Sequence, residues 1–263
     1  MCQIVSIHSF RGGTGKSNLV ANVAATIASQ GKNVGVVDTD IQSPGIHILF
    51  GLDESKIDYS LNDYLWGKCG IQDTAYDVSH VFPQQINSNI YLIPSSIKAG
   101  QIARILREGY DVSKLNDGFQ KLIDCLNLDY LLIDTHPGLN EETLLSIAIS
   151  DILVVLLRPD NQDFQGTGVT VDVARKLQVP KMLMVVNKVL PGFDFDALRQ
   201  DIETTYDTTL AGIIPLSEEM VQLASSGIFC LQHPHHPISK TVAKISSQIL
   251  GERQKVLVSN RGF

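Results

Sequence analysis

A glycine-rich loop lies between a strand pattern and a helix pattern near the N-terminus, and it limits the possible folds of this chain more than any other segment. The segment FRGGTGKS at residues 10–17 follows the apolar run of residues 4–7 and precedes a helical pattern. Glycines let backbone N–H groups curl around a phosphate, and the N-terminus of the following helix adds the positive end of its dipole. The order strand, loop, helix therefore predicts an α/β fold that binds a nucleotide.

The polar members of this loop have distinct expected roles. Lys16 would place an ammonium near the β and γ phosphates, and Ser17 would offer its hydroxyl to Mg²⁺. The pattern G-x-x-x-x-G-K-[ST] has glycine at the position of Phe10, so the loop is a variant of it. The residues expected to bind the nucleotide here are Gly12, Gly13, Thr14, Gly15, Lys16, Ser17 and Asn18.

A dinucleotide-binding fingerprint is the main competing interpretation, with Asp38 as the acid that would bind the ribose. The spacing argues against it, because Asn18 occupies the place of the third glycine. A dinucleotide loop also has no use for the Lys16-Ser17 pair. We therefore favour a nucleoside triphosphate over a nicotinamide or flavin cofactor.

Length and composition fit one large α/β domain over residues 1–263, with 44% hydrophobic residues to form a core. The formal net charge of −7 argues against a surface that is basic throughout. The start of the chain leads directly into a strand pattern without signal-peptide architecture, so we expect a cytoplasmic protein. Cys2, Cys69, Cys125 and Cys230 are far apart and are expected to be free thiols.

Apolar runs alternate with helical patterns along the chain, which predicts a mostly parallel, twisted sheet with helices on both faces. The first helix is expected over about residues 16–30, ending at Gly31, and the last near residues 238–250. Residues 52–89 are acidic and lose the alternation, so we expect an excursion from the sheet there. The expected strands are residues 4–9, 34–38, 90–94, 130–134, 152–157, 182–187 and 212–215.

Carboxylates follow two of the expected strands. Asp38 and Asp40 end the second run, and Asp134 ends the run at residues 130–134. Ligands collect at the carboxyl ends of strands in an open α/β sheet. These acids therefore suit magnesium binding through water and the positioning of a water for hydrolysis. Capping of a turn is the simpler interpretation of Asp38 and Asp40.

With these motifs the chain resembles ATPases of the ParA/MinD family, whose deviant Walker-A loop reads K-G-G-x-G-K-[ST]. Residues 11–17 match that loop, with Arg11 in place of the signature lysine. Residues 36–40 resemble the family's D-x-D motif. Residues 133–138 resemble its Walker-B strand, with His136 in place of the usual small residue or proline. Weaker similarities continue at residues 91–96, 187–188, 213–215 and 237–239.

The resemblance implies roles for single residues. Lys16 would bind the β and γ phosphates. Ser17 would be a ligand of Mg²⁺, and Asp38 and Asp134 would bind the same ion through its water molecules. Asp40 would hold the attacking water, which makes Lys16, Asp40 and Arg11 the expected catalytic residues. The further nucleotide contacts implied are the Gly138 N–H near the γ-phosphate and Asn187 and Pro215 at the base, with residues 135–140 as a nucleotide-sensing switch.

In the family, the first lysine of the loop crosses a dimer interface to the partner's ATP. Arg11 stands at that place, and a guanidinium can donate a bidentate fork to phosphate oxygens. The resemblance thus implies a homodimer with ATP sandwiched at the interface and Arg11 acting in trans.

Other conspicuous residues have plainer interpretations. We expect His136 to fill a switch-loop position without acting as a base, and the tract at residues 233–237 to form a turn rather than a metal site. Trp66 is expected to pack or to lie in an interface. Arg158 would lie near the nucleotide or a dimer interface, or form a surface ion pair.

The resemblance also implies partners. An adaptor protein would activate hydrolysis. Either of two basic surfaces could bind nonspecific DNA when a dimer doubles it, and a solvated face is the simpler interpretation of both. The apolar stretch at residues 255–258 is too short for the membrane-inserting helix of MinD-like proteins, so DNA is favoured over membrane. The basic residues concerned are Lys98, Arg104, Arg107, Lys114, Lys121, Lys240, Lys244, Arg253, Lys255 and Arg261.

Taken with the family, these features predict a slow ATPase that switches between monomer and dimer and positions or partitions a cellular cargo. One alternative is a carrier or regulatory ATPase of the same superfamily, although the chain lacks the cysteine pair that such carriers usually share. Another is a nucleotide-bound adaptor without significant hydrolysis.

Overall fold

The computed structural model describes residues 2–251. They form an eight-stranded sheet in the order β3-β4-β2-β5-β1-β6-β7-β8, parallel except for the β3–β4 pair at one edge. The strands are β1 (Gln3–His8), β2 (Val34–Asp38), β3 (Tyr76–Asp77), β4 (Ile90–Ile93), β5 (Tyr130–Asp134), β6 (Ile152–Leu157), β7 (Lys181–Val189) and β8 (Thr209–Pro215). This is the mostly parallel α/β sheet predicted from the sequence.

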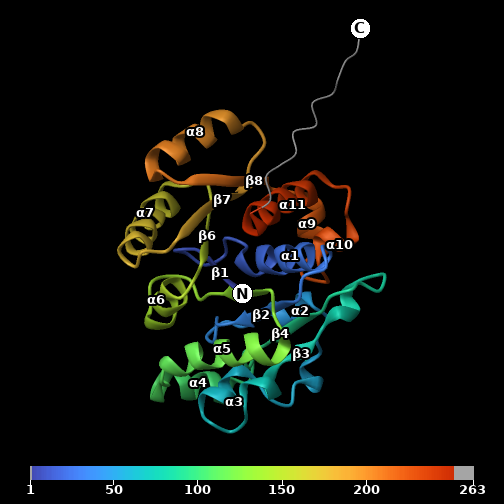
Figure 1. Ribbon diagram of the computed structural model, residues 1–263. Helices are drawn as coiled ribbons and strands as arrows, with labels where there is room; N and C mark the ends of the chain where they lie inside the picture. The colour runs from blue at the N-terminus through green and yellow to red at the C-terminus, as the bar shows by residue number, and fades with distance from the viewer. Residues whose placement is uncertain (1, 252–263) are drawn as a thin grey trace.

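Helices cover both faces of the sheet (Figure 1). The α-helices are α1 (Lys16–Ala28), α2 (Ile46–Leu49), α3 (Leu61–Leu65), α4 (Ala99–Glu108), α5 (Ser113–Leu126), α6 (Glu141–Ala148), α7 (Asn161–Lys176), α8 (Phe195–Tyr206), α9 (Glu218–Leu223), α10 (Phe229–Gln232) and α11 (Pro237–Leu250). Three 3₁₀ turns, η1 (Glu54–Lys56), η2 (Ile71–Thr74) and η3 (Ser79–Val81), lie between α2 and β4. None of the helices in residues 2–251 is long and apolar enough to span a membrane.

Two apolar layers hold the helices against the sheet. On one face α1, α2, α10 and α11 pack on alternate residues of the strands, such as Val5, Val36 and Val154. On the other face α3, α4 and α5 cover Val37 and Ile133, while α6, α7 and α8 cover the strands toward β8. Because both faces are covered, β2, β5 and β6 are buried along their whole length, as continuous apolar runs require.

The ends of the elements follow local chemistry. Helix α1 begins after Gly15, whose φ of +98° suits a residue without a side chain, and the chain leaves the helix through Gly31 at φ +82°. Helix α11 begins with Pro237 in its first turn and ends at Gly251. Asn140 and Asp160 cap α6 and α7 with their side chains.

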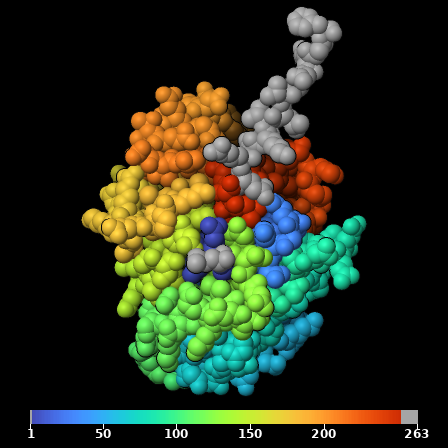
Figure 2. All heavy atoms as spheres, viewed as in Figure 1, coloured from blue at the N-terminus to red at the C-terminus, as the bar shows by residue number. Residues whose placement is uncertain are grey.

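The segment 52–89 carries the three 3₁₀ turns, α3 and the two-residue strand β3, which joins the sheet edge beside β4. In Figure 2 this cyan and teal segment lies at one end of the molecule, and the orange α8 lies at the other. That arrangement follows from the strand order, in which β3 and β8 are the two edges.

The carboxyl end of β1 lies at the centre of the sheet, where the direction of the chain connections changes. Strand β1 lies between β5 and β6, while the chain runs from β1 to β2 through α1 and from β5 to β6 through α6 on the opposite face. Such a change of direction opens a crevice at the carboxyl ends of the strands. The glycine-rich loop leaves β1 at this point.

Candidate functional site

The glycine-rich loop is held in shape by hydrogen bonds from neighbouring residues. The hydroxyl of Thr14 donates to Ser9 Oγ at 2.9 Å, and the hydroxyl of Ser9 donates to the carbonyl of Arg11 at 2.7 Å. Asn187 Nδ2 donates to the Thr14 carbonyl at 2.8 Å. The carbonyls of Arg11 and Thr14 are therefore held by neighbouring side chains, and the N–H groups of the loop are the donors expected to bind a phosphate.

Gly15 shows why this loop requires glycine. A Cβ built on Gly15 would lie 2.6 Å from Asn187 Nδ2, and its φ of +98° is unfavourable for other residues. The same Asn187 supports the loop through Thr14. Its expected place beside the base is therefore compatible with a second task, which is to hold the loop.

Lys16 is the first residue of α1 and is 7% exposed. Burial lowers the pKa of Lys16, while the charges of Asp134, Asp40 and Asp38 act in the opposite direction. A buried ammonium needs compensating negative charge, and these three carboxylates supply it. The structure thus gathers the lysine of the loop and the acids of two separate strands around one point.

Asp38 and Asp134 lie opposite one another at the ends of the neighbouring strands β2 and β5. Both are 1% exposed. Burial raises the pKa of Asp134 to about 7, and the charge of Asp40 adds to that rise, while Ser17 and Lys16 oppose it. Burial also raises the pKa of Asp38, with Asp134 and Asp40 acting in the same direction.

This pair fits a divalent cation. Asp134 Oδ1 is buried and has no hydrogen-bond partner within residues 2–251, although the hydroxyl of Ser17 reaches the same carboxylate. Asp38 accepts hydrogen bonds from the N–H groups of Asp40 and Gly45, at 3.0 and 3.3 Å. A hydroxyl and two carboxylates are the hard oxygen donors that Mg²⁺ prefers, directly or through water.

Asp40 lies at the rim of this cluster. Its Oδ1 accepts the Ser43 N–H at 3.1 Å and lies 2.7 Å from Nδ1 of His136. From the sequence, His136 was expected only to fill a loop position, and no spacing rule could have paired it with a residue 96 positions away. The contact arises because β2 and β5 are neighbours in the sheet.

His8 is a buried residue of the site that belongs to none of the motifs in the sequence. Its side chain is 0% exposed, and burial lowers its pKa to about 3, with the charges of Lys16 and His136 adding to the effect. The Thr135 hydroxyl donates to the Ile7 carbonyl at 3.0 Å, so His8 Nδ1, 2.9 Å from Thr135 Oγ1, is the donor in their contact. A neutral His8 therefore fixes Thr135 beside β1.

The segment 135–140 follows β5 and touches the glycine-rich loop. The N–H of Gly138 donates to the Ser9 carbonyl at 3.3 Å, and a Cβ on Gly12 would lie 3.8 Å from the Pro137 ring. The Thr143 hydroxyl of α6 donates to the His136 carbonyl at 3.3 Å. The expected role of Gly138 at the γ-phosphate stays a prediction, but its segment lies beside the loop as that role requires.

A cleft of about 210 Å³ opens beside the start of α1. One wall is polar and carries Asn187, and the other is largely apolar and carries Met220 and Val221 of α9. The lining residues are Gly15, Asn18, Asn187, Lys188, Pro215, Leu216, Ser217, Met220, Val221, Ala224 and Ser225. The cleft thus brings together Asn18, Asn187 and Pro215, which were expected to contact the nucleotide.

Arg11 points toward the N-terminus of α7. Its Nη1 lies 3.7 Å from Asp160 Oδ1 and 3.6 Å from Asp163 Oδ1, and its side chain is 41% exposed. Arg158 holds the same two acids and donates to Asp163 through Nε at 2.9 Å. Arg158 is therefore part of a partly buried ion-pair cluster that includes Arg11, which is more than the surface pair considered from the sequence.

Phe10 explains part of the departure from the general loop pattern. A Cβ on Gly166 would lie 2.0 Å from Phe10 Cδ1, so the phenyl ring occupies the space above this glycine of α7. The phenyl ring of Phe10 fills the space that a side chain at position 166 would occupy. The loop is therefore packed directly on α7, next to the Arg11 cluster.

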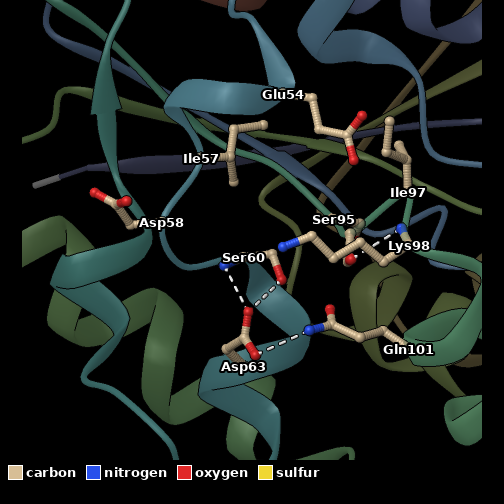
Figure 3. Close-up of a pocket in the computed structure, with 10 residues that line it drawn as sticks. Glu54, Ile57, Asp58, Ser60, Asp63, Ser95, Ile97, Lys98 and Gln101 are labelled. Carbon is tan, nitrogen blue, oxygen red and sulfur yellow. Dashed lines mark hydrogen bonds between the residues drawn. The ribbon is translucent and has the colours of Figure 1, made fainter.

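A second cavity lies between residues 54–63 and 95–101 (Figure 3). Its polar side chains bond to one another: Asp63 accepts hydrogen bonds from the Ser60 N–H at 3.1 Å and from Gln101 Nε2 at 3.2 Å. Ser95 at its edge donates to the Asp38 carbonyl at 2.7 Å and supports the acid cluster from behind. None of the expected nucleotide-binding residues lines this cavity.

The remaining candidate residues lie away from this cluster. Trp66 packs against the α3–α5 layer and lies beneath the cations of Arg104 and Lys68. His236 accepts the Ile238 N–H through Nδ1 and caps α11, so the histidine tract forms the turn before that helix. Within residues 2–251 no group of histidines, cysteines and acids could hold a metal ion by itself. Arg253, Lys255 and Arg261 lie outside the described residues.

The sheet topology, the phosphate loop and the acids at the neighbouring strand ends define a P-loop NTPase. A family model described as ParA, NUBPL iron-transfer P-loop NTPase, matches residues 1–250. This chain therefore belongs to the ParA/MinD family of P-loop NTPases.

Relatives in sequence include an uncharacterised ATP-binding protein of Methanocaldococcus jannaschii, 24% identical over 99% of this chain and 92% of its own. The septum site-determining protein MinD of Thermotoga maritima is 24% identical over 96% of this chain and 89% of its own. An iron-sulfur cluster carrier protein of Pyrococcus furiosus is 27% identical over 70% of this chain and 60% of its own.

Solved structures show the same fold. The cell division ATPase MinD of Pyrococcus furiosus has a TM-score of 0.80 at 23% identity, covering 95% of this chain and 99% of that one. MinD of Pyrococcus horikoshii, complexed with Mg-ADP, has a TM-score of 0.77 at 20% identity, covering 95% and 96%.

Proposed function

We propose that this chain is a Mg²⁺-dependent ATPase whose slow hydrolysis of ATP times a switch between monomer and dimer, and that the dimer positions or partitions a cellular cargo. The observation that carries the proposal is the convergence of Asp38, Asp40 and Asp134 on Lys16. Binding a nucleotide does not by itself require three acids at one phosphate site. Binding a metal ion and orienting a water for hydrolysis do require such acids.

The residues would divide the work as follows. The N–H groups of the loop and Lys16 bind the β and γ phosphates, and Asn18, Asn187 and Pro215 in the cleft bind the base. Ser17, Asp38 and Asp134 would hold Mg²⁺, which supplies charge neutralisation at the phosphate oxygens when it is bound. The MinD of Pyrococcus horikoshii that shares this fold is complexed with Mg-ADP, which supports this choice of ligand.

Hydrolysis would use Asp40 to orient the attacking water. The water oxygen forms a bond to the γ-phosphorus as the bond from that phosphorus to the bridging oxygen breaks, and ADP leaves with the electron pair. The proton of the water passes to Asp40 or to a phosphate oxygen. Gly138 would exchange its hydrogen bond with Ser9 for one with the γ-phosphate, so that residues 135–140 report which nucleotide is bound.

Dimerisation would place Arg11 on the ATP of the partner subunit. Its pairing with Asp160 and Asp163 is long and its side chain is 41% exposed, so leaving that pairing costs little free energy. A phosphate offers the guanidinium a bidentate partner in exchange. The low cost of leaving this pairing supports the proposal that Arg11 changes partners between the two states.

Light scattering and phosphate release test this role. Arg11→Ala is expected to remain a monomer in Mg²⁺ and ATP and to lose most of its hydrolysis, while wild type doubles in mass. Lys176→Ala, which removes an exposed cation at the far end of α7, is the matched control and is expected to dimerise. If Arg11→Ala dimerises and hydrolyses ATP like wild type, the trans role is wrong.

The partners proposed are an activating adaptor protein and nonspecific DNA, with a membrane less favoured. Lys98, Arg104, Arg107, Lys114 and Lys121 lie on or beside α4 and α5, and a dimer would present them twice. Retention of the protein on DNA only with ATP, and its loss at raised salt, is the expected result of a filter-binding assay.

A carrier ATPase is the second candidate. It is favoured by the description of the matching family model as an iron-transfer NTPase and by the similarity to iron-sulfur cluster carriers. Against it, the four cysteines are separated along the chain and within residues 2–251 form no metal-binding group. Anaerobic reconstitution with iron and sulfide distinguishes the two, because a carrier binds a cluster with visible absorbance and a positioning switch does not.

A further inference from the structure

His136 makes one close contact for which neither the family resemblance nor the fold requires a histidine. Its Nδ1 lies 2.7 Å from Oδ1 of Asp40, and both side chains are largely shielded, 20% and 17% exposed. The backbone of His136 is fixed on both sides, because Thr135 is anchored to β1 and the Thr143 hydroxyl donates to the His136 carbonyl. Pro137 further restricts the residue before it to an extended backbone.

The two oxygens of the Asp40 carboxylate have different surroundings. Oδ1 receives both the Ser43 N–H, at 3.1 Å, and His136 Nδ1. Within residues 2–251 no hydrogen bond reaches Oδ2, and the carboxylate acts electrostatically on Lys16 and Asp134, which places it beside the phosphate site. One oxygen is therefore held by protein, and the other is available to a water.

We propose that His136 is a positioning residue for hydrolysis, whose Nδ1–H holds Asp40 so that Oδ2 faces the attacking water. This inference rests on the proposed ATPase function and adds a residue to it. The arrangement resembles the general rule that a group acting on a nucleophile is itself oriented by a third group. It also links Asp40 to residues 135–140, so a change in that segment carries the orientation of Asp40 with it.

Two amide variants separate this role from simple packing. Asn places its Nδ2 at the same distance from the backbone as Nδ1 of histidine, so His136→Asn keeps the donor to Asp40. Gln places its amide one carbon further out, near the position of Nε2, so His136→Gln loses it. Misplacement of a catalytic group by about 1 Å can lower a rate by roughly 100-fold.

In single-turnover phosphate release we expect His136→Asn to keep most of the wild-type rate constant for hydrolysis. His136→Gln and His136→Ala should lower that rate constant by about 10-fold to 100-fold. The Kd for a fluorescent ATP analogue should stay within about twofold in all three, because the histidine holds Asp40 and touches no nucleotide. In an Asp40→Asn background the His136→Gln change should have no further effect, since residues that act as a unit are not additive.

A measurement without nucleotide tests the contact itself. Nitrogen-15 spectra of histidine-labelled protein should show His136 as the Nδ1–H tautomer. That signal should shift in Asp40→Asn but not in Asp53→Asn, a control at the residue that caps the exposed η1 turn.

Equal kcat values for the Asn and Gln variants, or an Nε2–H tautomer, overturn the inference. If wild type itself releases no phosphate, the proposed ATPase function fails and the positioning role falls with it. The spectra still report whether the His136–Asp40 contact exists, so the two failures are distinguishable.

Discussion

At the scale of single residues, the acids at the strand ends define the chemistry. Asp38 and Asp134 are buried side by side, which is unfavourable for two carboxylates unless a cation or a proton neutralises them. Lys16 supplies one positive charge nearby. The remaining negative charge is what a magnesium nucleotide would meet, so stability and ligand binding should be coupled through these residues.

Asp134 makes the stability of the fold depend on pH. Its ordinary pKa of 3.8 is raised to about 7 in the folded protein, so the folded state keeps a proton that the unfolded chain has lost. Its stabilising contribution is present below the lower value and is lost as the pH rises through the higher one. Without metal, the contribution of Asp134 to the free energy of unfolding should fall by at most about 1.4 kcal/mol per pH unit in this window. Asp38, whose pKa burial also raises, acts in the same direction, and the buried His8, whose pKa is lowered, acts in the opposite one.

Urea titrations in EDTA between about pH 5 and pH 8 measure this contribution as the difference between wild type and Asp134→Asn. Added Mg²⁺ should stabilise wild type more at the upper end of the range, because the ionised carboxylate binds the cation. Identical pH profiles for wild type and Asp134→Asn would show that the residue does not titrate in this way.

Alanine substitutions at Gly15 and Gly12 can be compared directly, because both glycines lie in the same loop. Gly15→Ala brings a Cβ to 2.6 Å from Asn187 Nδ2 at a positive φ, whereas a Cβ on Gly12 meets its nearest neighbour at 3.8 Å. We expect Gly15→Ala to lower the free energy of unfolding by about 1–3 kcal/mol, and Gly12→Ala to change it far less. Thermal unfolding of the nucleotide-free proteins measures both, and equal effects would contradict the steric argument.

At the scale of elements, the loop after β1 and the N-terminus of α7 form one unit. Asp163, which is 2% exposed, joins them by accepting hydrogen bonds from the N–H and the Nε of Arg158 while lying 3.6 Å from Arg11. Phe10 adds an apolar contact on Gly166. Movement of α7 is thereby coupled to the residue expected to act in trans.

The contact between Phe10 and Gly166 is testable with glycines of the same helix. Gly166→Ala would place a Cβ 2.0 Å from the ring, while a Cβ on Gly168 would lie 3.9 Å from Tyr206. Overpacking of this kind costs about 1–3 kcal/mol, so Gly166→Ala should unfold at lower temperature and Gly168→Ala should not. Adding Phe10→Ala to Gly166→Ala should restore part of the loss; no restoration would place the strain elsewhere.

At the scale of the whole molecule, the proposed switch is an equilibrium between one and two copies. A dimer that forms only with ATP makes the apparent stability depend on protein concentration, because dilution favours the monomer. We expect the melting temperature in Mg²⁺ and a slowly hydrolysed ATP analogue to rise with protein concentration. In Mg²⁺ and ADP the melting temperature should not change with protein concentration. A melting temperature that rises with protein concentration in both nucleotides would contradict a switch driven by the γ-phosphate.

Much of the fold could be predicted from the sequence because its strands are buried on both faces and stand out as continuous apolar runs. The runs at residues 34–38, 130–134 and 152–157 match β2, β5 and β6 at both ends. Strands β7 and β8 extend further than predicted, to residues 181–189 and 209–215, because polar positions at sheet edges and strand ends interrupt the pattern. The two-residue β3 carries no periodic signal at all.

The α/β class, the phosphate loop and the acids that follow β2 and β5 can be recognised without the structure, since they depend on local spacing and on which strand ends meet at one edge of a parallel sheet. The contacts of His136 with Asp40, of Phe10 with Gly166 and of Arg11 with Asp160 and Asp163 are seen only in the folded chain. Each of these contacts joins segments far apart in the chain, and their geometry is set by how strands and helices pack, which no local pattern encodes.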